Sequence, residues 1–163
     1  MVGRTPTGRV IDGLNEVTKL NAGDGYIQGI EVGGRWELVR GLTLFGSVAV
    51  QDGELEGFPN SSRKSEVEPV SRMLPLTGLV GLRWDSPERR FWLEGNVQLV
   101  DRQDRLSASD IRDTQRIPPG GTPGYTVATV RGGWRVNELL TLTAAVENVT
   151  DESYRIHGSG VNE

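Results

Sequence analysis

The chain has 163 residues, and its 22 acidic and 18 basic side chains give it a formal net charge of −4. The basic side chains are scattered along the whole length, so no basic stripe exists that could neutralise phosphates, and nucleic acid is not expected as a partner. The sequence contains no cysteine, which excludes disulfides and thiolate metal sites.

Membrane helices are not expected either. No apolar run approaches the ~20 residues that a membrane helix needs, and the N-terminal stretch lacks the apolar core of a signal peptide. A β-barrel is compatible with this polar average, because only every second residue of its strands faces lipid.

Alternation of apolar and polar residues predicts long β-strands. Between residues 25 and 38, Ile30, Val32 and Trp36 fall on one face, whereas Glu31 and Arg35 fall on the opposite face. The same period of two recurs in five later stretches, and a weaker one precedes them. The expected strands, in chain order, are Asn15 to Asn21 (weak), Gly25 to Leu38, Leu42 to Gln51, Leu74 to Asp85, Arg90 to Asp101, Thr126 to Val136 and Leu140 to Asn148.

The connections between these strands alternate between short and long. Short turns are expected at Val39 to Gly41, Ser86 to Arg89 and Asn137 to Glu138. The intervening links, Asp52 to Arg72 and Arg102 to Gly124, are long, polar and rich in proline and glycine. Long loops at one rim and tight turns at the other are typical of an outer-membrane barrel.

Aromatic residues support this interpretation. Trp36, Trp84 and Trp134 recur about every 50 residues, each on the apolar face and close to a short turn. Tyr26 lies on the same face ten residues before Trp36, and ten strand residues tilted near 40° rise roughly 25 Å, the height of a barrel's apolar band. We therefore predict that these four residues belong to a membrane girdle.

Three stretches resemble the C-terminal part of TonB-dependent outer-membrane receptors. They are GYIQGIE (residues 25–31), RIPPGGTPGY (residues 116–125) and ENVTDESYRIHGSG (residues 147–160), and the similarity extends over nearly all of the chain from about Asn21. The resemblance implies an all-β, antiparallel up-and-down meander that forms part of a transmembrane β-barrel. It also implies a bacterial outer-membrane location and a role in the barrel wall of a receptor that imports a scarce ligand, such as a ferric siderophore or cobalamin.

The chain also departs from the family pattern. The N-terminal plug and the segment that contacts the TonB complex have no counterpart, and the chain ends at Glu163, before the closing strand. We therefore expect residues 1–163 to form a single partial barrel segment, open or only partly closed as a fragment, with two free edges. Its expected partners are outer-membrane lipid, the missing plug and strands, and, through the missing N-terminal part, the TonB complex.

Chemistry is expected to be sparse. The lone His157 has no nucleophile elbow to work with, so no enzyme activity is expected, and neither a cofactor nor a metal site is predicted. The acidic run Asp52, Glu54, Glu56 lacks the spacing of a calcium loop and is interpreted as a solvated loop. Ligand contact, if any, is assigned to basic loop residues, and a charged loop without ligand contact is the alternative: Arg63, Lys64, Arg72, Arg102, Arg105, Arg112 and Arg116.

Charged residues of the polar strand face are expected to form salt-bridged ladders along the wall or to meet the plug. These residues are Glu31, Arg35, Glu37, Arg83, Glu94, Arg131, Arg135 and Glu147.

Two other classes of protein remain as alternatives. A soluble β-sandwich binding module would bury Trp36, Trp84 and Trp134 against a second sheet, so the exposure of these side chains separates the two hypotheses. An outer-membrane barrel enzyme would need a catalytic cluster on the rim, and the sequence offers none.

Overall fold

The structure is a computed structural model that describes residues 2–21, 24–57 and 65–160. Within these ranges the chain forms nine strands and one short helix. In chain order these are β1 (Val2–Ile11), β2 (Leu14–Asn21), β3 (Gly25–Val39), β4 (Leu42–Gly57), β5 (Glu66–Pro69), β6 (Thr77–Asp85), β7 (Phe91–Val100), α1 (Ala108–Arg112), β8 (Tyr125–Arg135) and β9 (Thr141–Val146).

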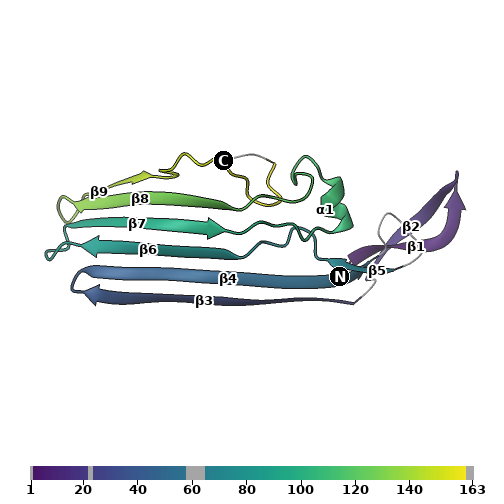
Figure 1. Cartoon of the computed structure of the whole chain (residues 1–163), viewed down its shortest axis with the longest axis horizontal. Coiled ribbons are helices and arrows are strands. Elements are labelled where there is room, and N and C mark those ends of the chain that lie inside the picture. The colour runs from purple at the N-terminus through teal and green to yellow at the C-terminus, as the bar shows by residue number, and fades with distance from the viewer. Residues whose placement is uncertain (1, 22–23, 58–64, 161–163) are drawn as a thin grey trace.

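A seven-stranded antiparallel meander dominates the molecule. Its strand order is β3-β4-β6-β7-β8-β9, and β5 pairs with the far end of β4. The three short turns lie together at one end of the sheet, whereas α1, the long loops and the separate β1-β2 hairpin lie at the other end (Figure 1). β3 and β9 are unpaired edges, so the sheet is not closed. The expected open meander is confirmed.

The strand register places the apolar residues of neighbouring strands on one face. Leu44 of β4 stands opposite Trp36 of β3 on one side and Leu82 of β6 on the other, and Trp84 of β6 stands opposite Leu93 of β7. The register therefore sets apolar residues opposite apolar residues across the short turns and the long links alike. We call this apolar side the outer face and the opposite side the inner face.

The outer face is exposed along its length. Trp36 is 69% exposed, and Trp84 and Trp134 are each 44% exposed. Among the described residues, Ile117 and Val127 are the only buried hydrophobic residues, so no dry core lies between stacked sheets. This arrangement contradicts the β-sandwich alternative, which requires these tryptophans to be buried.

On the inner face, two aromatic rings lie over glycines of the neighbouring strand. Phe45 stands opposite Gly81, and Trp92 stands opposite Gly133. A Cβ atom at Gly133 would lie 2.2 Å from Nε1 of Trp92, and one at Gly81 would lie 2.4 Å from Cζ of Phe45. These glycines make room for the rings, which in turn cover the exposed glycine backbone.

A Gly133→Ala substitution should therefore destabilise the folded chain by about 1–3 kcal/mol, because the Trp92 ring has to move. Gly34→Ala is the matched control, since a Cβ atom there meets nothing within 4 Å. Urea denaturation of the folded, detergent-solubilised chain would measure the difference. Equal midpoints for both variants would show that the ring is not held against this glycine.

Several elements differ from the sequence-based expectation. The weak strand before residue 22 is real, but its partner β1 was not predicted, because glycine and proline interrupt its alternation. The link expected to begin at Asp52 is wrong in its first part: residues 52–57 continue β4, which pairs there with β5. β6 begins at Thr77 instead of Leu74, since Pro75 has no amide hydrogen for the ladder.

The second long link contains α1, a helix of five residues that is too short to show helical periodicity. No helix in the described part of the chain is long and apolar enough to cross a membrane.

Candidate functional site: the loop rim and the inner wall

The described parts of the long loops meet around α1, and we call this end of the sheet the loop rim. Ser107 caps the helix in a capping box, in which its side chain accepts from the amide of Asp110 and the Asp110 side chain accepts from the amide of Ser107. Glu68 of β5 also accepts from the amide of Ala108, at 2.8 Å. A carboxylate at this end of the helix compensates the unpaired amides of the first turn.

Asp110 joins the helix to a second loop. Its carboxylate accepts from the Ser71 hydroxyl at 2.6 Å and from the Arg72 amide at 3.3 Å, and the residue is only 2% exposed. Burial by itself would raise the pKa of Asp110, but the hydrogen bonds from Ser71, Ser107 and Arg72 outweigh it and lower the pKa. Asp110 is therefore ionised and structural.

His157 ties the C-terminal segment to the same rim. Its Nδ1 lies 2.8 Å from the Thr122 hydroxyl, and its Nε2 is buried without a partner among the described residues. Thr122 in turn pairs with Gln103, whose side chain donates to the Met73 carbonyl at 2.7 Å. His157 is thus a buried loop residue, and no nucleophile is placed against its Nε2.

The rim should loosen when His157 is protonated. Burial, assisted by Arg72 and opposed by Asp110, holds the pKa of His157 below its usual 6.5. Between that lowered pKa and 6.5 the unfolded loop binds a proton that the folded loop does not, so the stabilisation is complete above about pH 6.5 and is lost as the pH falls below it.

Hydrogen exchange of the Thr122 amide would measure this effect. We expect its protection factor to fall several-fold between pH 7.5 and 5.5, and to be nearly constant in His157→Asn, which keeps an amide nitrogen near the Nδ1 position but cannot titrate. The same decline in both variants would assign the effect to another group.

Most predicted ligand-contact residues are paired with rim carboxylates. Arg72 and Arg116 both contact Asp113, at 3.0 and 3.1 Å. Burial tends to raise the pKa of Asp113, but the hydrogen bonds from Arg116 and Arg72 lower it overall. This site is therefore a carboxylate held between two guanidinium groups.

Arg105 reaches from the second long link back to β4, where it forms ion pairs with Asp52 and Glu54. Two members of the acidic run therefore serve as partners of an arginine. Arg102 lies 3.5 Å from Asp104 and donates to the Gly120 carbonyl at 2.8 Å.

The remaining predicted loop residues have different surroundings. Arg112 is exposed in the last turn of α1, whereas Arg63 and Lys64 lie outside the described residues. Ligand contact by any of the predicted loop residues stays a prediction.

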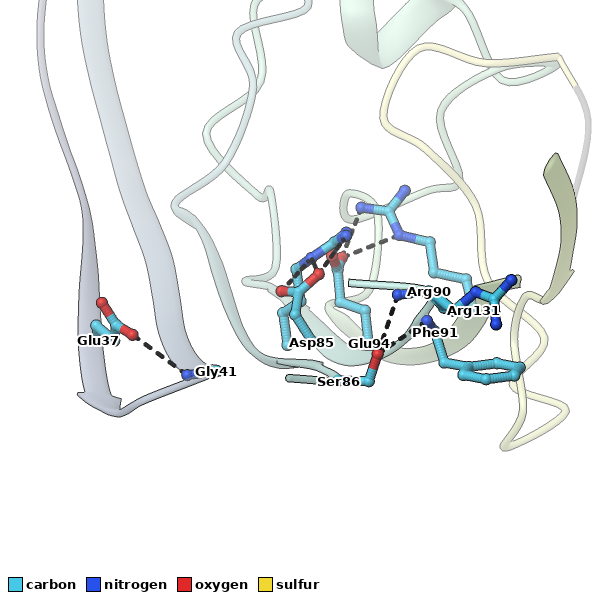
Figure 2. Close-up of polar contacts among 9 residues, drawn as sticks. Glu37, Gly41, Asp85, Ser86, Arg90, Phe91, Glu94 and Arg131 are labelled. Carbon is cyan, nitrogen blue, oxygen red and sulfur yellow. Dashed lines mark hydrogen bonds and ion pairs between the residues drawn. The ribbon is translucent and has the colours of Figure 1, made fainter. Parts of the chain in front are cut away.

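The inner face of the sheet, called the inner wall below, carries a salt-bridge network across three strands. Glu94 of β7, 5% exposed, accepts from Nη2 of Arg131 at 2.6 Å and from Nη1 of Arg83 at 3.4 Å. Arg83 also donates to Asp85, at 3.0 Å, and lies 4.3 Å from the ring centre of Trp92 (Figure 2 shows the carboxylates and Arg131). The predicted ladder is confirmed for Arg83, Glu94 and Arg131, which stand opposite one another on the neighbouring strands β6, β7 and β8.

The other charged residues assigned to this face take no part in the network. Glu37 accepts from the Gly41 amide at 3.2 Å and so supports the turn between β3 and β4 (Figure 2). Ser86 supports the next turn in the same way, accepting from the amides of Arg90 and Phe91. The following residues have no ion pair within the described ranges: Glu31, Arg35, Arg135 and Glu147.

The predicted girdle residues lie at the two ends of the outer face. Trp36, Trp84 and Trp134 lie near the short turns, and Trp134 stacks on Phe91 with ring centres 5.8 Å apart. Tyr26 lies near the loop end, where its hydroxyl donates to Asp52 at 3.5 Å. Their contact with a membrane stays a prediction. Among residues 2–21, 24–57 and 65–160, no group of three or more histidine, aspartate or glutamate side chains could hold a metal ion.

Sequence reasoning missed Trp92. Trp92 alternates with the apolar residues Phe91 and Leu93, so the period of two puts it on the polar face. This pattern could have identified it as an inner-face residue. Its two contacts, with Arg83 and Gly133, depend on the register and could not have been found from the sequence.

Comparisons with known proteins agree with this architecture. The model of the family described as "TonB dependent receptor-like, beta-barrel" matches residues 1–149. A solved structure named "Copper transporter OprC" is similar over 100% of this chain, with a TM-score of 0.68 and 20% sequence identity. This chain covers only 24% of that protein, and at this identity the likeness concerns the fold alone. No curated protein matches the chain.

Proposed function

The chain belongs to the TonB-dependent receptor β-barrel family, and from this premise we propose that it forms part of the wall of an outer-membrane transporter. The observation that carries the proposal is the exposed apolar outer face. Side chains such as Val32, Leu82 and Leu93 are 60%, 47% and 55% exposed on the same face of one sheet. An apolar area of this extent is costly in water and is favourable against lipid tails.

The proposed cargo is a scarce ligand that requires energised import, such as a ferric siderophore or cobalamin. Copper, which the name of the structural neighbour gives for that protein, is a further candidate. The loop rim carries both positive and negative side chains, and most of its predicted ligand-contact arginines are paired with carboxylates. A ligand would therefore have to compete for pairs such as Arg105 with Glu54, rather than meet free cations.

The proposed partners follow from the two unpaired edges. Every residue of β3 and β9 is exposed. The unpaired edge of each strand offers backbone amides and carbonyls with which a further strand could pair. Further barrel strands would satisfy these groups, a plug would face the inner wall, and the TonB complex would act through a part of the protein outside this segment.

Fractionation of bacteria that produce the protein would test the proposal. We expect the protein in the outer-membrane fraction and, on intact cells, trypsin cleavage at Arg112, which is exposed in the loop rim, but not at Arg40 in a short turn. Lysis of the cells should make Arg40 accessible, which controls for its intrinsic reactivity. Recovery in the soluble fraction would contradict the proposal. Cleavage at Arg40 on intact cells would mean that the short turns, and not the loop rim, face the outside of the cell.

A further inference from the structure

A groove of about 620 Å³ crosses the inner wall beside the Glu94 network. Gly33, which lies on the inner face with Arg35, contributes no side chain to it, so the surface is hollow there. The polar and charged side chains that line the groove come from five strands: Arg35 of β3, Ser47 of β4, Arg83 of β6, Glu94 of β7 and Arg131 of β8.

The carboxylates nearest this groove already accept hydrogen bonds. Both oxygens of Glu94 are turned toward guanidinium groups, one toward Arg131 and the other toward Arg83, and its side chain is only 6% exposed. Asp85 holds the other side of Arg83. Glu37, the next side chain after Arg35 on the same face, accepts from the Gly41 amide.

The donors, in contrast, are in excess. Arg35 has no hydrogen bond or ion pair among the described residues, and neither does the Ser47 hydroxyl. Arg131 uses Nε and Nη2 on Glu94, which leaves Nη1 without a partner in the same ranges, and its side chain is 51% exposed. Two guanidinium groups and a hydroxyl thus line a groove whose one lining carboxylate, Glu94, is already paired with arginines.

We propose that this groove is a binding site for a small carboxylate anion, held between Arg35 and Arg131 with Ser47 as a third donor. Guanidinium groups bind carboxylates through paired, charge-assisted hydrogen bonds, and an unpaired donor set of this kind matches an acceptor-only ligand. The site deepens the proposed function and rests on it, because it places a contact for an anionic group of the cargo on the inner wall, away from the loop rim.

Protection of individual arginines would test the site. The purified protein in detergent at low salt is treated with phenylglyoxal, with and without millimolar malonate, and modification of each arginine is followed by peptide mass spectrometry. We expect malonate to slow modification of Arg35 and Arg131 about fivefold or more, as two charge-assisted bonds would. Arg40, an exposed arginine in a short turn, should react at the same rate throughout.

Malonamide, which has the shape of malonate without its charge, should protect neither residue. Arg35→Gln removes an arginine without a structural partner, so it should leave the fold intact while reducing malonate protection of Arg131 by about threefold or more. Ser47→Ala should reduce the protection of both arginines by a smaller factor.

Unchanged reactivity of Arg35 and Arg131 in malonate would overturn the inference, as would equal protection by malonamide. Undiminished protection of Arg131 in Arg35→Gln would also overturn the shared site. These outcomes are independent of fractionation: a protein found in the outer membrane without arginine protection contradicts only the anion site, and a protected but soluble protein contradicts only the proposed function.

Discussion

Val97→Arg should prevent stable insertion of the chain into a bilayer. Val97 lies on the outer face of β7, opposite Val80 of β6 and Ala128 of β8. If this face contacts lipid, an arginine within the apolar band costs about 2–4 kcal/mol at mid-depth. We expect a lower folded fraction in lipid vesicles, measured by urea titration.

Gln98→Arg is the matched control for that substitution. Gln98 is the next residue in β7, is exposed and faces the inner side, so an arginine there meets water rather than lipid. The control should fold as the unmodified chain does. Equal loss in both variants would mean that the two faces of the sheet have the same surroundings, and the membrane interpretation would fail.

Glu94→Ala should give the second large effect. The substitution leaves Arg131 without its partner and removes one of the two carboxylates that hold Arg83. Breaking a buried pair by removing one side costs 3–5 kcal/mol, but Arg131 is half exposed, so we expect about 2–4 kcal/mol. The midpoint of urea denaturation should fall accordingly.

Glu31→Ala is the control for Glu94→Ala. Glu31 lies on the same face but is exposed and has no ion pair among the described residues, so its removal should change stability by less than about 0.5 kcal/mol. A double-mutant cycle with Arg131→Ala would separate the pair interaction from the loss of packing. Additive effects would show that the 2.6 Å contact contributes nothing to stability.

The strands and their two faces could be predicted from the sequence because both depend on local spacing. Successive side chains of a strand point to opposite faces whatever its neighbours are, so Ile30, Val32 and Trp36 mark an apolar face without knowledge of the fold. The open sheet was also predictable, since the length of the connections and the family resemblance both implied an up-and-down meander.

The contacts between strands were decided by the tertiary structure. The pairs of Trp92 with Gly133 and of Arg83 with Glu94 depend on which residue stands opposite which in the β7-β8 and β6-β7 ladders. Five residues are too few for helical periodicity, so α1 became visible only through its tertiary contacts with Ser71 and Glu68.

Thr122 and His157 are 35 residues apart in the chain, and only folding brings them within 2.8 Å. The sequence by itself therefore determined which residues form strands and which face each side chain takes, because these follow from the geometry of a single extended chain. The tertiary structure decided which side chains meet, because bringing distant segments together costs chain entropy that only the folded structure as a whole offsets.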